Sequence, residues 1–237
     1  GSPAGYYYQR PQARRSRLWL VYLEGGGLCF DGPSCASRCA EPTSPLCRYA
    51  EEDSNSRQHT HALLLSTRLC PACRSSRAWE RSIPSSGLLH ADPPSELATA
   101  NKIFVRYCSS DAFVGDSAVF GRQFRGEKII KALVADLVEF LGLGRTGAES
   151  ETVVLAGSSS GAYGAMAHLD YVLPMLEPVL GPAAGAIVRV VGFLDSPLQV
   201  AMPALPTVDP SRVLAFGDRE RRMAASFNVG HLGDACT

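Results

Sequence analysis

A serine in a short turn flanked by glycines is the first feature of this 237-residue sequence that could do chemistry. Residues 157–161 read Gly-Ser-Ser-Ser-Gly and match the G-x-S-x-G pattern, with Ser159 at the centre. In such a turn, small neighbours let a strand and the next helix approach each other, and the first helical amides face developing negative charge. The pattern therefore predicts Ser159 as a nucleophile. A plain glycine-serine loop of ordinary composition is the structural alternative.

Three consecutive glycines, Gly25, Gly26 and Gly27, form a second cluster, separated by Glu24 from an apolar run that ends at Leu23. Glycines let backbone amides come close to an oxyanion, and hydrolases with a serine turn of this kind carry such a loop after an early strand. A tight turn would use glycine equally well. We expect the two glycine clusters to lie side by side.

A serine attacks an ester at neutral pH only when a histidine takes its proton and an acid orients that histidine. With this turn the chain order is Ser, Asp, His, so both partners must follow Ser159. His168 falls nine residues along the next helix, about 13 Å from the turn at 1.5 Å per residue, and we interpret it as a surface or packing histidine. The other downstream candidates, none well placed, are Asp170, Asp195, Asp209, Asp218, Asp234 and His231.

Two nucleotide-binding interpretations of the serine turn fail on residue type and spacing. A phosphate loop needs a lysine that reaches the phosphates, and residues 157–164 contain none. The spacing of Gly157, Gly161 and Gly164 does not fit the G-x-G-x-x-G pattern of dinucleotide sites. The hydrolase interpretation remains.

Apolar runs alternate with helical patterns along the chain. Apolar positions at three-and-four spacing predict a helix over 127–143, and a second helix is expected over 162–176 until Pro174 and Pro178 disturb it. Continuous apolar strands between such helices indicate an α/β fold with a mostly parallel sheet and helices on both faces. The predicted strands are residues 18–23, 102–107, 152–156 and 187–194.

Eight cysteines are many for a cytosolic enzyme, and their even number favours an oxidising compartment. The alternative is a zinc-stabilised module, because Cys70 and Cys73 have zinc-knuckle spacing and Cys39, Cys47, His59 and His61 lie upstream. Only one tight cysteine pair exists, so we assign no metal ligand. Serine, arginine, proline and cysteine dominate residues 31–85, which predicts a surface excursion.

Composition excludes several classes of function. Lysine plus arginine and aspartate plus glutamate both number 23, so no basic field indicates nucleic-acid binding. The apolar stretches are strand-length, too short for a transmembrane segment, and the first residues lack a signal-peptide pattern. Asp111 and Asp116 are interpreted as turn caps, and residues 219–222 as a solvated helix face.

The segments GSPAGYY, WLVYLEGGGLCF, RYCSSDAF, FRG and GSSSGAYG resemble the pectin acetylesterase/Notum carboxylesterase family, in the same order and at similar spacing. The similarity runs from Gly1 to about Pro197 and continues more weakly to Cys236. It lapses between Cys39 and Arg74, which indicates a cysteine-rich surface insertion at about 39–74. The insertion would belong to a single, partial domain that spans residues 1–237.

The resemblance implies an α/β-hydrolase fold, incomplete at its C-terminus. It implies Ser159 as nucleophile and the backbone amides of Gly26, Gly27 and Ser160 as the oxyanion hole. Ser160 stands where the family typically has alanine, and Leu28 where plant-type members carry tryptophan. The segment around His231 resembles the one that precedes the strand bearing the family's acid. The catalytic Asp and His are therefore expected beyond the last residue, which would make the chain a truncated member.

We thus expect a serine carboxylesterase that hydrolyses O-acyl esters of a polysaccharide or an acylated protein, without metal or organic cofactor. The chain alone should show little or no turnover, because its general base is missing. The alternative is a non-catalytic pseudoenzyme that binds a glycan, lipid or acylated partner. The cysteine count and the resemblance together predict an extracellular or secretory-pathway location.

Overall fold

The structure is a computed structural model that describes residues 4–11, 16–40, 76, 79–90, 96–145, 150–182, 184–197 and 216–230. The expected insertion at about 39–74 lies outside the described residues, apart from the two residues that end the first helix.

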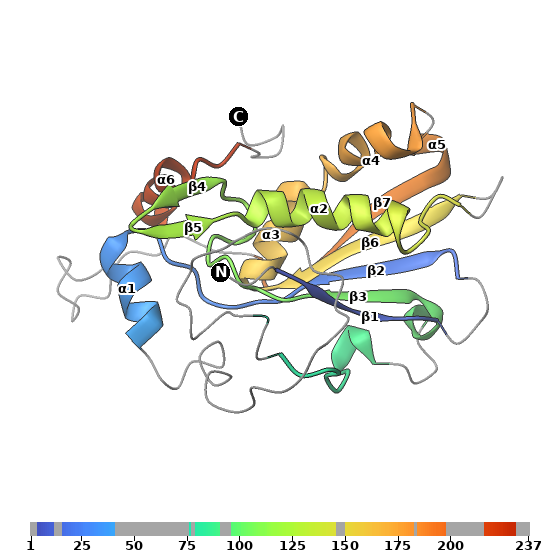
Figure 1. Cartoon of the computed structure of the whole chain (residues 1–237), viewed down its shortest axis with the longest axis horizontal. Helices are drawn as coiled ribbons and strands as arrows, with labels where there is room; N and C mark the ends of the chain where they lie inside the picture. Colours follow the sequence, from blue (N-terminus) through green and yellow to red (C-terminus); the bar gives the residue numbers. More distant parts are fainter. Residues whose placement is uncertain are drawn as a thin grey trace.

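A five-stranded, mostly parallel sheet forms the centre of the molecule (Figure 1), with strand order β1-β3-β2-β6-β7. Strands β3, β2, β6 and β7 run parallel to one another, and β1 pairs antiparallel with β3 at one edge. All four predicted strands are confirmed, whereas β1 was not predicted. The strands are β1 (Tyr6–Gln9), β2 (Leu18–Leu23), β3 (Asn101–Val105), β6 (Glu151–Ser158) and β7 (Val188–Asp195).

The register of the sheet brings three loops to one edge. Leu23 at the end of β2 lies opposite Gly157 of β6 and Val105 of β3. Ser158 at the end of β6 lies opposite Asp195 of β7. Because parallel strands end at the same edge of a sheet, the glycines after β2 and the serines after β6 become neighbours.

Helices cover both faces of the sheet, as predicted. One face is covered by α-helices and the other by short 3-10 helices. The α-helices are α1 (Gly32–Ala40), α2 (Gly126–Glu139), α3 (Ser160–His168), α4 (Val172–Leu180), α5 (Ala184–Ile187) and α6 (Phe216–Phe227). In the described part of the chain before β3 lie the 3-10 helices η2 (Gly87–Leu89) and η3 (Glu96–Thr99). A small hairpin, β4 (Ser117–Val119) and β5 (Arg122–Phe124), precedes α2.

The main core lies between one face of the sheet and α2, α3 and α4, which Figure 1 shows on the same side. Alternate residues of β2, such as Val21, face this core. Leu20 and Ala156 face the other side, where Leu88 of η2 and Leu97 of η3 pack against them. Both faces are therefore covered by apolar side chains, which explains why the strands read as continuous apolar runs.

The prediction of one helix over residues 162–176, ended by prolines, was wrong in its extent and in its cause. Residues 162–176 do not form one helix, because α3 ends at His168 and α4 begins at Val172. The prolines did not cause this break: Pro174 lies in the first turn of α4, where its missing amide has no helical partner, and Pro178 lies inside α4. In addition, the expected surface excursion over 31–85 begins with a helix, α1.

Candidate active site

The chain turns sharply at Ser159, between β6 and α3. Its backbone has φ 54 and ψ −122, a conformation that L-residues rarely adopt and that requires support from the surroundings. The Ser159 amide donates a hydrogen bond to the carbonyl of Asp195 (3.0 Å), and its carbonyl accepts one from the Tyr163 amide (3.1 Å). The Ser159 side chain is exposed. The corner is thus fixed from both neighbouring elements, and Ser159 lies at the surface.

The two glycines of the G-x-S-x-G pattern allow this corner to pack tightly. A Cβ at Gly157 would come within 3.0 Å of the carbonyl oxygen of Gly161. A Cβ at Gly161 would also come within 3.0 Å of the carbonyl oxygens of Leu23 and Glu24. Neither position leaves room for a side chain, because the opposing atoms belong to the backbone.

The glycine bend, residues 25–27, lies directly against the serine corner, as the sequence predicted. A Cβ at Gly25 would lie 2.5 Å from the carbonyl oxygen of Ser158 and 3.4 Å from the Cβ of Ser159. The Ser160 hydroxyl donates a hydrogen bond to the carbonyl oxygen of Gly26. Ser160 is only 4% exposed, so this bond is shielded from water. Backbone amides of the bend and of α3 therefore lie next to an exposed serine.

Glu24 fixes the start of the glycine bend to the end of β3. The Glu24 amide donates to the carbonyl of Val105 (3.0 Å), and its carboxylate accepts the Tyr107 amide (2.7 Å). The same carboxylate lies 3.2 Å from the Arg106 guanidinium. Sequence reasoning missed Glu24, although an acidic residue immediately before three glycines is the one signal that could have drawn attention to it.

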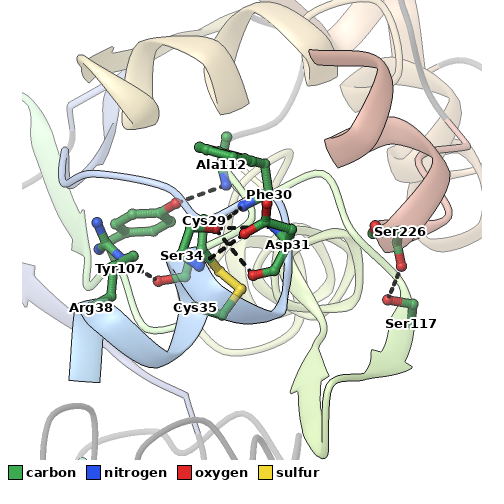
Figure 2. Close-up of a disulfide and its surroundings, with 11 residues drawn as sticks. Cys29, Phe30, Asp31, Ser34, Cys35, Arg38, Tyr107, Ala112, Ser117 and Ser226 are labelled. Atoms are coloured by element: carbon green, nitrogen blue, oxygen red, sulfur yellow. Dashed lines mark hydrogen bonds between the residues drawn. A yellow bond between two sulfur atoms is a disulfide. The ribbon is translucent and has the colours of Figure 1, made fainter. Parts of the chain in front are cut away.

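A disulfide between Cys29 and Cys35 follows the bend and encloses the start of α1 (Figure 2). Asp31 caps this helix: its carboxylate accepts the Ser34 amide (2.8 Å), and the Ser34 hydroxyl accepts the Asp31 amide (3.0 Å). The hydrogen bond from the Ser34 amide holds the pKa of the Asp31 carboxyl below its usual value. A disulfide agrees with the expected oxidising compartment.

Arg38, near the end of α1, reaches back to the same region. Its Nε donates a hydrogen bond to the Ser110 hydroxyl (3.0 Å), and a Cβ at Gly27 would come within 3.0 Å of its guanidinium. Sequence reasoning missed Arg38, and no local pattern marks it, because only the fold brings it to the bend.

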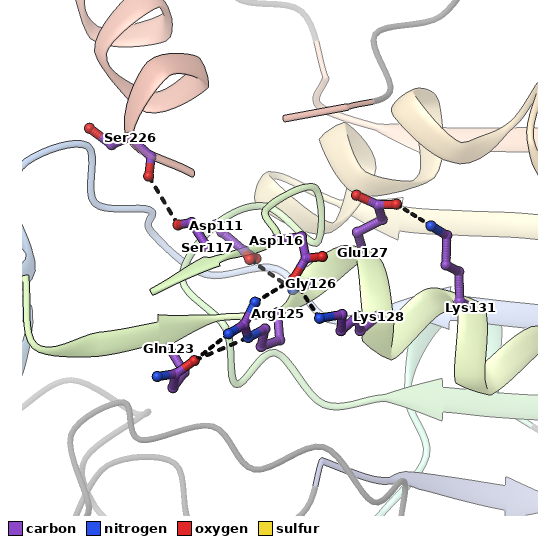
Figure 3. Close-up of polar contacts among 10 residues, drawn as sticks. All are labelled: Asp111, Asp116, Ser117, Gln123, Arg125, Gly126, Glu127, Lys128, Lys131 and Ser226. Carbon is purple, nitrogen blue, oxygen red and sulfur yellow. Dashed lines mark hydrogen bonds and ion pairs between the residues drawn. The ribbon is translucent and has the colours of Figure 1, made fainter. Parts of the chain in front are cut away.

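The two aspartates expected to cap turns do have structural roles (Figure 3). Asp111 is fully buried, and its carboxylate accepts the amides of Phe113 (3.0 Å) and Gly126 (2.8 Å). Burial raises the pKa of Asp111, and these amides oppose that rise. Asp116 pairs with Arg125 (2.5 Å) and Lys128 (3.1 Å).

Neither histidine in the described ranges is brought to Ser159. His168 is buried, and its Nε2 lies 2.8 Å from the carbonyl oxygen of Phe113, so it is the packing histidine of the two alternatives. His90 follows η2, and its carbonyl accepts a hydrogen bond from the Lys102 ammonium. Lys102 lies near the start of β3, whereas the serine corner lies at the edge where the parallel strands end. Of the downstream acids, Asp195 contacts Ser159 through its backbone carbonyl, while its carboxylate accepts the Ser196 hydroxyl (2.9 Å). Asp209 and Asp234 lie outside the described residues. His231 lies outside the described residues.

The described residues contain no group of three or more His, Cys, Asp or Glu side chains arranged to hold a metal ion. The side chains of the zinc alternative, including Cys70 and Cys73, fall outside that part of the chain. Within it, no helix is long and apolar enough to cross a membrane. A cavity of about 660 Å³ lies along β1 and the 81–89 segment, away from the serine corner.

A family model described as Pectinacetylesterase matches residues 1–196. The chain belongs to the pectinacetylesterase family. Palmitoleoyl-protein carboxylesterase NOTUM of Homo sapiens is 34% identical to it over 201 residues, which cover 83% of this chain and 33% of that protein. Pectin acetylesterase 4 of Arabidopsis thaliana is 29% identical over 178 residues, with coverages of 72% and 35%. This family member thus spans about a third of the length of these curated relatives.

Among solved structures, the Wnt deacylase Notum from Drosophila superposes with a TM-score of 0.72 at 26% sequence identity. The superposition covers 100% of this chain and 57% of the Drosophila chain. The mixed, mostly parallel sheet and this likeness place the chain in the α/β-hydrolase fold class. By their names, the relatives of this family member are carboxylesterases and acetylesterases.

Proposed function

We propose that this family member is the front part of a serine carboxylesterase, with Ser159 as the nucleophile. The observation that carries the proposal is the serine corner itself: Ser159 is exposed, its backbone has positive φ, and it lies against Gly25 of the glycine bend. A strained turn of this kind lifts a serine out of a sheet edge so that an acyl group can reach it.

In the proposed reaction the Ser159 oxygen attacks the carbonyl carbon of an O-acyl ester, and the carbonyl oxygen becomes an anion. The backbone amides of Gly26, Gly27 and Ser160 are the proposed donors to that oxyanion. The alcohol leaves with the proton that Ser159 loses, and water then attacks the acyl-enzyme and releases the acid. The proposed substrate is an O-acylated polysaccharide or an acylated protein, the two classes that the names of its relatives suggest.

A fluorophosphonate probe tests the nucleophile, because its phosphoryl oxygen must occupy the same oxyanion site. We expect slow but selective labelling of Ser159 in this chain, since an oxyanion hole retains part of the rate when the base is missing. Peptide mapping by mass spectrometry locates the adduct. Ser159→Ala should abolish labelling, and Ser158→Ala, the matched control from the same serine triplet, should not. Equal labelling of both serines, or none, contradicts the proposal.

A non-catalytic binding protein is the second candidate, and the positions of His168 and His90 favour it. Both described histidines lie away from Ser159, so no described side chain can accept its proton efficiently. Under this alternative the chain binds an ester without labelling or hydrolysis. Because the chain alone is expected to turn over little substrate under either candidate, fluorophosphonate labelling at Ser159, compared with Ser159→Ala, separates the two. We further propose an extracellular or secretory location, which the Cys29–Cys35 disulfide supports.

A further inference from the structure

Two consecutive residues of the glycine bend are held by different helices. Gly26 accepts the hydroxyl of Ser160, the first residue of α3. Gly27 packs against Arg38 of α1, so closely that the guanidinium occupies the space where a side chain at position 27 would begin. The absence of a Cβ at Gly27 is therefore what lets Arg38 reach the backbone of the bend.

Arg38 is anchored at its other side to a buried loop. Its Nε donates to the hydroxyl of Ser110, which is 2% exposed, and the carbonyl of Ser110 accepts the Cys29 amide (3.2 Å). The Cys29–Cys35 disulfide connects that point to the start of α1 (Figure 2). Bend, disulfide, helix and arginine thus form a closed loop of contacts that begins and ends at Gly27.

We propose that Arg38 is a positioning residue that fixes Gly27 and thereby one amide of the proposed oxyanion hole. This inference rests on the proposed function. A guanidinium is planar and stays charged at any working pH, so it can brace a backbone and also add positive potential beside the site of developing negative charge. Arg38 acts through Gly27 and does not contact the substrate.

The test measures fluorophosphonate labelling of Ser159 in the whole chain at several probe concentrations, which separates the binding constant KI from the rate constant kinact. Arg38→Met should lower kinact on the order of tenfold, less than the loss of an oxyanion donor itself, and leave KI unchanged. Arg38→Lys keeps the charge without the planar fork and should recover part of the rate. If Arg38 only stabilised the fold, its replacement would lower the amount of folded protein, but the folded molecules would keep the kinact of the unaltered chain.

Arg222→Met is the matched control. Arg222 also contacts the disulfide loop, with its Nη1 3.5 Å from the Asp31 carboxylate, but its side chain is 54% exposed and approaches from α6. We expect it to label at the rate of the unaltered chain. If Arg38→Met folds poorly, Ser110→Ala replaces it, because that change removes only the hydroxyl that anchors Arg38 and should also lower kinact.

Three results would overturn the positioning role: unchanged kinact in folded Arg38→Met, unchanged kinact in Ser110→Ala when Arg38→Met does not fold, or an equal loss in Arg222→Met. Failure of the proposed function looks different. In that case the unaltered chain itself forms no adduct at Ser159, and the role of Arg38 falls with it.

Discussion

At the scale of single residues, the serine corner combines strain with close packing. A non-glycine residue at φ 54 and ψ −122 costs on the order of 1–3 kcal/mol, and Ser159 adopts this conformation although glycine would do so without cost. Such strain persists only where surrounding contacts outweigh it, here the bonds to Asp195 and Tyr163. The residue with the strained backbone is therefore also the proposed nucleophile.

Replacement of the serine by glycine should stabilise the protein. Ser159→Gly removes the strain but adds freedom to the unfolded chain, so we expect a net gain of about 1 kcal/mol in the free energy of unfolding. Urea denaturation followed by fluorescence measures it. Ser159→Ala keeps a Cβ and should show no such gain. If the glycine variant is no more stable than the alanine variant, the backbone at residue 159 is not strained as proposed.

A side chain in the glycine bend should disturb the corner. In Gly25→Ala the new Cβ would lie 2.5 Å from the Ser158 carbonyl oxygen, so bend and corner must move apart. We expect a loss of about 1–3 kcal/mol in the free energy of unfolding and slower labelling of Ser159. Gly230→Ala is the control, because its nearest neighbour, the Glu127 carboxylate, lies 3.7 Å away. Equal behaviour of the two variants would show that the bend tolerates a Cβ.

At the scale of elements, α1 is a nine-residue helix whose start is fixed by a cap and a disulfide. Helices this short are marginal alone, so the contacts at the ends decide whether Arg38 is held in place. Asp31 contributes most directly, because its carboxylate satisfies the Ser34 amide.

Loss of this cap should be measurable and dependent on pH. Asp31→Ala should lower the free energy of unfolding by about 0.5–2 kcal/mol at neutral pH. Because folding depresses the pKa of Asp31 from 3.8, its charge contributes stability above that pH, and the contribution disappears as pH falls through the folded-state pKa. Asp31→Asn caps nearly as well but does not titrate. A difference between the unaltered chain and Asp31→Ala that stays constant from pH 6 to pH 2.5 would contradict this.

The elements that could be predicted from the sequence are those whose pattern is local. The run over 18–23 is apolar throughout because both faces of β2 are covered, and it was predicted to the residue. Strand β1 carries tyrosines and Gln9 at the sheet edge, and no apolar run marks it. Pro174 misled because a proline is harmless in a first helical turn, where it lies. Ser159 and the glycine bend were proposed from residue type and spacing, whereas the contacts of Arg38 and Glu24 arise only from tertiary packing.

At the scale of the whole molecule, a second, smaller core joins segments far apart in the sequence. It contains the disulfide, the β4–β5 hairpin and α6, and the rings of Phe124 and Phe227 stack with centroids 4.1 Å apart. The Phe227 carbonyl also accepts the Asp116 amide (2.8 Å). Helix α6 is thus fastened to the same region that carries the glycine bend.

Truncation of the central ring should release α6. Phe227 is fully buried, so Phe227→Ala should cost about 3–5 kcal/mol in the free energy of unfolding. Amide hydrogen exchange should quicken first in α6 and in the hairpin, while β2 and β6 stay protected. Phe140→Ala, at a residue 59% exposed, serves as the control and should cost several-fold less. Uniform exchange across the sheet and α6 would show that the small core does not unfold separately.

The contact between Asp31 and Arg222 spans 191 residues, so the two sides of the small core are synthesised at different times. Cys29 and Cys35 are six residues apart and can oxidise soon after they emerge from the ribosome, whereas Phe227 is made much later. Once α6 arrives, both sulfurs are almost completely enclosed, at 1% and 2% exposure of their residues. We therefore expect the disulfide to form before α6 packs, because a chain that closes first would bury both thiols out of reach of an oxidoreductase.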